Sequence, residues 1–142
     1  METAAIREIW TYLFINMIPL GLLGIVLITI AVLALLKHIF KVRYVLLLFL
    51  LGALTVGYAI AEISLFHFDL KEEAFEEYSG SFVYKDVSGN LEDRVQLIEN
   101  PNLYVRSISD YSLLSDTYCG QVLYCRRSRW VIQMSAEPLL LE

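Results

Sequence analysis

The sequence predicts a membrane α-helical hairpin of two transmembrane helices, followed by a small all-β, OB- or SH3-like antiparallel domain. Two apolar runs, at about 12–36 and 44–66, carry the first half of this prediction. Each exceeds the roughly 20 residues that an α-helix needs to cross the hydrocarbon core of a bilayer. The second half rests on the residues after Asp69, which are polar, rich in tyrosine and divided into short strand-like runs.

The division of the chain follows its composition. The 142 residues are 57% hydrophobic, more than is usual for a soluble domain, and the apolar excess lies before Asp69. The remainder is short enough that it buries only a thin core. We expect an N-terminal tail (1–11), a two-helix hairpin (12–68) with a connecting loop (37–43), an acidic helical stem (69–79), a β domain (80–135) and a C-terminal tail (136–142).

The connecting loop predicts the orientation in the membrane. It carries Lys37, Lys41 and Arg43 and no acidic residue. Short loops rich in Lys and Arg stay on the cytoplasmic side. We therefore expect a multi-pass protein of the cytoplasmic (inner) membrane whose N-terminus and C-terminal domain are extracytoplasmic. The first apolar run is too long for a cleaved signal peptide and lacks a basic segment before it.

Small residues recur every four positions in the second apolar run, at Ala53, Gly57 and Ala61. Such a stripe lets two helix backbones approach closely. It either packs the two spans of one chain together or holds the second span against another chain, a second copy included. Glu62 follows the stripe, and is either an interfacial glutamate in contact with water or a partner-facing or proton-carrying group.

The stem is predicted from its strong helix formers. Residues 69–78 contain neither glycine nor proline, and Gly80 suits the end of a helix. Strand-like alternation begins after this point, and turn residues separate the runs. The expected strands are 81–85, 94–98, 103–108, 118–125 and 130–134, with turns at 88–90, 99–102 and 126–129 and a loop or single helical turn at 109–117.

Charge and residue types exclude several kinds of function. Thirteen acidic and seven basic residues follow Phe66, which disfavours nucleic-acid binding. The two histidines, His38 and His67, belong to opposite membrane faces in this topology, so we expect no metal site. We find no nucleophile with a base and no glycine-rich phosphate loop, so we expect no cofactor and no enzyme.

Cys119 and Cys125 are the only cysteines. An oxidising compartment favours a disulfide, but two cysteines six positions apart on one strand lie about 20 Å apart. A bridge needs Cα atoms within about 7 Å, so it requires a turn between them. We expect a single strand there and free thiols.

A basic cluster next to a tryptophan is the candidate partner-binding site. Arg126, Arg127, Arg129 and Trp130 occur together in an otherwise acidic domain, and Arg and Trp are frequent interface anchors. The cluster is either a docking surface for an acidic partner or lipid headgroups, or a solvated hairpin turn that protects a sheet edge. The acidic stem at 72–77 is the second candidate surface. The six tyrosines from Tyr78 to Tyr124 form either a recognition face or part of the core.

These observations favour a membrane-anchored, non-catalytic binding protein at the outer face of the cytoplasmic membrane. Its sharpest form is an immunity or inhibitor protein against a toxin that arrives there. The alternative is an accessory subunit of a larger membrane complex, such as transporter, secretion or envelope machinery. That subunit would pack through Ala53, Gly57, Ala61 and Glu62. A ligand sensor and an enzyme are weaker alternatives.

Overall fold

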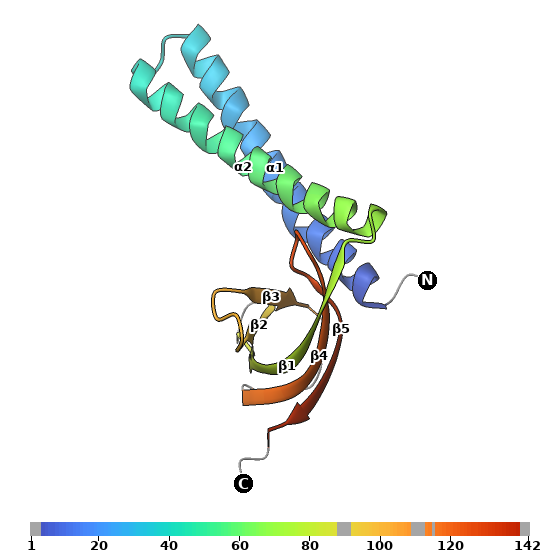
Figure 1. The fold of residues 1–142 in the computed structure, drawn as a ribbon. Coiled ribbons are helices and arrows are strands. Elements are labelled where there is room, and N and C mark those ends of the chain that lie inside the picture. Colours follow the sequence, from blue (N-terminus) through green and yellow to red (C-terminus); the bar gives the residue numbers. More distant parts are fainter. Residues whose placement is uncertain (1–3, 88–91, 109–112, 115, 140–142) are drawn as a thin grey trace. The chain divides into compact units, whose positions relative to one another are not determined.

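The computed structural model describes residues 4–87, 92–108, 113–114 and 116–139. Its contacts form two compact units (Figure 1). Leu13–Ser64 make up the first unit. Met1–Tyr12 and Leu65–Glu142 make up the second, which therefore joins the two helix ends to the strands.

The structure contains two long apolar helices, as the sequence predicts. Helix α1 spans Ala4–Leu36 and helix α2 spans Val42–Lys71. Both are long and apolar enough to cross a membrane. Helix α1 begins before the predicted span at 12–36 and ends with it. Helix α2 begins before the predicted span at 44–66 and ends after it.

The two helices pack through a pair of glycines. A Cβ atom on Gly24 would lie 2.8 Å from the carbonyl oxygen of Gly52, and a Cβ on Gly52 would lie 2.7 Å from that of Gly24. The absent side chains therefore let the backbones touch, as small residues do in membrane helix pairs. Further along the same unit, Ala31, Ala34 and Val45 are buried together.

We expect Gly24→Leu and Gly52→Leu to disrupt this packing, because each adds a side chain where backbone already lies. Forced overpacking of this kind typically costs about 1–3 kcal/mol. Gly57→Leu is the matched control, since a Cβ at Gly57 meets no described atom within 4 Å. Thermal melting of the helical circular dichroism signal in detergent compares the three variants. Equal melting temperatures for all three would contradict the Gly24–Gly52 contact.

Helix α2 ends earlier than the predicted stem. The amide of Ala74 donates to the carbonyl of Asp69 (2.9 Å), and the amide of Glu73 donates to that of Leu70 (3.4 Å). Glu73 has a positive φ of 50°. These are the bonds of a Schellman motif, which closes a helix with one left-handed residue. A glutamate takes the place that glycine usually fills, so the sequence carries no obvious stop signal.

The helical stem predicted for 69–79 is therefore wrong after Lys71. Strand β1 begins at Phe75 and runs to Lys85, and β4 spans Asp116–Cys125. The two strands pair antiparallel from Phe75 opposite Cys125 to Tyr84 opposite Asp116. This long non-local ladder outweighs the local helix propensity of the acidic residues, which is a weak preference.

Five strands form one antiparallel, curled sheet (Figure 1). Strand β2 spans Asp93–Leu97, β3 spans Tyr104–Ser107 and β5 spans Val131–Pro138. The neighbours follow the order β3-β2-β1-β4-β5, so β4 returns to lie beside β1 in a Greek-key arrangement. A parallel bridge between Arg106 and Trp130 brings the end of β3 to the start of β5 and curls the sheet into a half-barrel.

The strand predictions are close to the structure, with shifted ends. The predicted strand at 81–85 is the last part of β1, and the predicted β domain at 80–135 begins at Phe75 instead. The predicted tail at 136–142 starts inside β5, which continues to Pro138. The predicted turn at 88–90 and most of the predicted loop at 109–117 lie outside the described residues.

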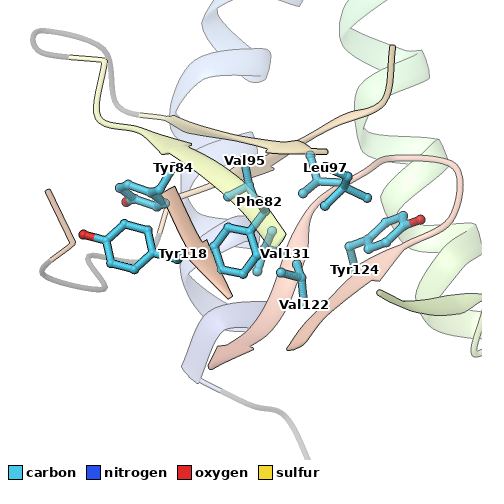
Figure 2. Packing of buried hydrophobic residues seen from close by; sticks show 9 residues of the cluster. Phe82, Tyr84, Val95, Leu97, Tyr118, Val122, Tyr124 and Val131 are labelled. Carbon is cyan, nitrogen blue, oxygen red and sulfur yellow. The ribbon is translucent and has the colours of Figure 1, made fainter. Parts of the chain in front are cut away.

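The core of the half-barrel is aliphatic and aromatic. Figure 2 shows labelled side chains of β1, β2, β4 and β5 meeting inside the curled sheet. The buried cluster comprises Phe82, Tyr84, Val95, Leu97, Val105, Tyr118, Val122, Tyr124 and Val131. Of the six tyrosines from Tyr78 to Tyr124, three are therefore core residues: Tyr84, Tyr118 and Tyr124. Their hydroxyls donate to polar groups: Tyr118 to the Leu114 carbonyl (3.0 Å), Tyr124 to Glu76 (2.9 Å) and Tyr84 to Asp93.

Candidate functional site

The predicted basic cluster lies on the turn between β4 and β5. The amide of Cys125 donates to the carbonyl of Trp130 (2.8 Å), which closes the hairpin below the turn. The amide of Arg129 donates to the Cys125 carbonyl (2.9 Å), and Arg129 has a φ of 60°. Residues 126–129 thus form a four-residue turn whose last member is left-handed. We call this segment the arginine turn.

A buried carboxylate holds the arginine turn against the end of α2. Asp69 has none of its surface exposed. Its Oδ2 accepts hydrogen bonds from the backbone amide of Ser128 (2.7 Å), from the Ser128 hydroxyl (2.8 Å) and from the amide of Arg127 (3.1 Å). Hydrogen bonds from several donors compensate a carboxylate for the loss of water. The helix end and the turn therefore form one hydrogen-bonded unit, which we call the Asp69 junction.

Two exposed arginines of the turn, Arg126 and Arg127, contact glutamates of the same chain. Arg127 donates through Nη2 to Oε2 of Glu72 (2.5 Å). Arg126 lies 3.3 Å from Glu76, measured between Nε and Oε1, and its backbone amide donates to the carbonyl of Ala74 (2.9 Å). The first and second predicted binding surfaces thus lie side by side. The sequence did not predict this proximity, because the two surfaces are about 50 residues apart along the chain.

Trp130 lies inside the domain. Its side chain is fully buried, and its ring packs edge-to-face against the Tyr12 ring, with ring centres 5.5 Å apart. The guanidinium of Arg106 lies 4.2 Å from the centre of the tryptophan ring. A cation over an aromatic face is attractive, more so when water is excluded. Trp130 therefore anchors the hairpin from within.

The stripe Ala53-Gly57-Ala61 lies on an exposed face of α2 within its unit. All three residues are exposed, whereas Gly52 and Ala59 are buried against α1. Glu62 is half-buried. The stripe therefore lies outside the contact between α1 and α2, and its contact with another chain stays a prediction.

A polar hollow on the outer face of the sheet was not predicted. Its volume is about 210 Å³, and Glu77, Gln121, Leu123, Gln133 and Ser135 line it. Glu77 faces Leu123 across β1 and β4, while Gln121 faces Ser135 across β4 and β5. Along β4 and β5 these residues alternate with more buried neighbours. This alternation was the signal in the sequence from which the outward-facing residues could have been identified. The hollow presents hydrogen-bond donors and acceptors.

The two cysteines are free and occupy different environments. Cys119 is exposed on β4, while Cys125 is fully buried beside the Asp69 junction. Burial raises the pKa of the Cys125 thiol to about 12, because the thiolate loses solvation there. Burial and the hydrogen bond to Glu76 likewise raise the pKa of Tyr124 to about 12.

These pKa values predict loss of stability in alkali. Between pH 9 and 12 the unfolded chain releases the Cys125 proton while the folded chain retains it, so the free energy of unfolding falls as pH rises. Each retained proton contributes a slope of up to about 1.4 kcal/mol per pH unit. We expect chemical unfolding from pH 8 to 11 to show this decline. Cys125→Ala should make the decline shallower than in the wild type, and an unchanged slope in Cys125→Ala would be contrary evidence.

Comparisons with protein-family models, with curated proteins and with solved structures found no match to this chain.

Proposed function

We propose that the two helices cross the cytoplasmic membrane and that the N-terminus and the β domain are extracytoplasmic. The observation that carries this proposal is the exposure of large apolar side chains along both helices; Leu22 is 57% exposed and Leu47 is 64% exposed. Apolar surface this extensive is costly in water and favourable in hydrocarbon. The cations of the 37–43 loop support a cytoplasmic position for that loop.

Cys119 is a natural probe of this topology. A membrane-impermeant maleimide applied to intact cells, with any outer membrane permeabilised, should label the wild type and not Cys119→Ser. A single cysteine placed at Lys41, in a chain that lacks the two native cysteines, should be labelled only after lysis. Labelling of the Lys41→Cys chain but not of Cys119 in intact cells would reverse the orientation.

We propose that the domain acts by binding another protein, most sharply as an immunity or inhibitor protein against a toxin at that face. The arginine turn supports this role, because its side chains remain accessible: that of Arg126 is 70% exposed and that of Arg127 is 42% exposed. Ion pairs between exposed groups contribute little, so partner carboxylates can replace Glu72 and Glu76 at small cost. The polar hollow offers additional hydrogen-bonding groups.

Affinity purification of the full-length protein in mild detergent, followed by mass spectrometry, tests this role. The partner should be recovered with the wild type and lost with Arg126→Glu/Arg129→Glu, which reverses two charges of the turn and leaves Asp69 its donors. Arg94→Glu is the matched control, because Arg94 is exposed on β2 and its guanidinium lies over the Tyr104 ring, 5.4 Å from the ring centre. Equal recovery in all three would exclude the arginine turn as the binding surface.

We also assign the half-barrel to the OB type. An OB-fold is a five-stranded, partly open Greek-key barrel. The Greek-key order and the Arg106–Trp130 bridge between β3 and β5 support this assignment. Oligonucleotide binding, which some OB-folds perform, is disfavoured here by the excess of acidic residues.

An accessory subunit of a membrane complex is the second candidate, and the exposed face of α2 favours it. Nothing described lies within 4 Å of a Cβ placed on Gly57. A helix of another chain can approach closely there. Under this candidate, Gly57→Leu abolishes co-purification with other membrane proteins, while Leu51→Phe, on another exposed face, preserves it. Preserved co-purification of Gly57→Leu would remove this candidate.

A further inference from the structure

We propose that the loop end of the helical hairpin binds an anionic phospholipid. An acyl chain occupies an apolar hollow between the two helices, and the headgroup contacts Lys37, Lys41 and Arg43. This inference rests on the proposed membrane location of the helices, but not on the binding role of the β domain.

The first hollow lies between α1 and α2 near the loop. Its volume is about 250 Å³. It is lined by apolar side chains from both helices: Ala31, Val32, Leu35, Val45, Leu46 and Phe49. Ala31 is too short to fill the space beside its larger neighbours. In a bilayer, an empty apolar hollow loses dispersion contacts, which a lipid chain restores.

A second hollow lies next to the loop, on the other side of α2. Phe40, Tyr44, Leu47 and Leu48 line its volume of about 400 Å³. The Arg43 guanidinium lies 4.8 Å from the centre of the Tyr44 ring, and its Nη2 donates to the Tyr44 hydroxyl (3.0 Å). One tyrosine thus lines the hollow and positions a cation at its rim. The remaining guanidinium donors suit the oxygens of a phosphate.

Charge complementarity identifies the occupant. Lys37, Lys41 and Arg43 are the only Lys or Arg residues in 13–64, and Glu62 is the only Asp or Glu. Glu62 lies 19 residues beyond Arg43, about 28 Å along a helix. No described acid pairs with the three cations. Basic pockets between membrane helices on the cytoplasmic side bind anionic headgroups.

Other occupants fit this arrangement less well. A second copy would bring the same three cations against the loop, and their repulsion would oppose contact. A soluble acidic peptide would satisfy the cations but leave the apolar hollow between the helices unfilled. A phospholipid with a negative headgroup matches both features, because it presents a phosphate beside a hydrocarbon chain.

Native mass spectrometry of the full-length protein in detergent tests the headgroup contact. Phosphatidylglycerol and phosphatidylcholine with identical acyl chains are added in equal amounts. We expect the wild type to retain one phosphatidylglycerol with at least a 10-fold preference. Lys37→Gln/Lys41→Gln/Arg43→Gln should reduce the preference to near unity. Lys71→Gln/Lys85→Gln/Arg94→Gln, which removes three cations elsewhere, should keep it.

Two further measurements test the acyl hollow. Leu46→Trp fills the first hollow at an exposed position, and should weaken the retention of both lipids at least several-fold. Glycerol 3-phosphate, a headgroup without chains, should not displace the bound lipid. Unchanged retention in Leu46→Trp, displacement by glycerol 3-phosphate, or equal retention of both lipids by the wild type would overturn the proposal.

The outcomes separate this inference from the proposed function. Recovery of the protein in the membrane fraction without headgroup preference refutes the lipid site alone. Recovery in the soluble fraction refutes the membrane location itself.

Discussion

Asp69→Ala is expected to open the junction between α2 and the arginine turn, at a cost of about 3–5 kcal/mol. The substitution removes the acceptor from two backbone amides and the Ser128 hydroxyl. Because the amides belong to the main chain, they remain as donors in the variant and lose their acceptor. Each buried donor left without a partner costs about 1–3 kcal/mol. Asp69→Asn keeps one carbonyl oxygen and should cost less.

Cys125 reports this opening directly. Its thiol is fully buried beside the junction, so a maleimide reaches it only when the hairpin separates from the helix end. In a Cys119→Ser background, the labelling rate of Asp69→Ala should rise at least about 100-fold, as a cost of 3 kcal/mol implies. The measurement uses the full-length protein in detergent.

Glu72→Gln is the matched control for Asp69→Ala. It removes the exposed carboxylate that accepts a hydrogen bond from Arg127, but leaves the buried acceptor in place. Exposed ion pairs contribute little to stability, so the labelling rate should stay near that of the parent. Equal rates in Asp69→Ala and Glu72→Gln would show that Asp69 does not hold the hairpin.

Gly120→Ala is expected to destabilise the β domain by a comparable amount. A Cβ at this position would lie 1.9 Å from the carbonyl oxygen of Ser135 and 3.2 Å from the Cα of Ala136. Both atoms belong to the backbone of β5, which cannot rotate away as a side chain does. The ladder between β4 and β5 must therefore separate locally. Effects above about 4 kcal/mol are exceptional for one substitution and mark such backbone conflicts.

Fluorescence of the buried Trp130 during chemical unfolding measures this effect, with Trp10→Phe used to remove the other tryptophan. Gly120→Ala should unfold at a much lower denaturant concentration than the parent. Ser79→Ala is a suitable control, because Ser79 is exposed on β1 near the same level of the sheet. A parent-like midpoint for Gly120→Ala would show that β4 and β5 lie further apart at this point.

The helices and most strands were predictable because local patterns specify them. An apolar run of the length of 12–36 has few alternatives to a helix, and period-two alternation marked the strands. The stem at 69–79 failed for a definite reason. Its acidic residues favour a helix locally, but Phe75–Tyr84 gain a full ladder with β4, which no local signal announces.

The candidate site was predictable in part. Arg126, Arg127 and Arg129 lie on a hairpin turn, as expected. The contacts of Arg126 with Glu76, and of Arg127 with Glu72 and Asp69, depend on the tertiary fold. Trp130 was expected at a surface and lies in the interior, because its ring fills the space between Tyr12 and Arg106. The polar hollow depends on the register of three strands, which the sequence does not specify.

By itself, the sequence determined the two long apolar helices, the change to a β domain and the identity of the charged groups, since these depend on neighbouring residues. Only the tertiary structure decided which of these groups meet. For example, the carboxylate of Asp69 accepts a hydrogen bond from the backbone amide of Arg127, 58 positions away. It also selected Gly24 and Gly52 for the helix contact and left the stripe through Gly57 exposed. Small residues permit close approach anywhere along a helix, and the packing of the whole unit determines which of them are used.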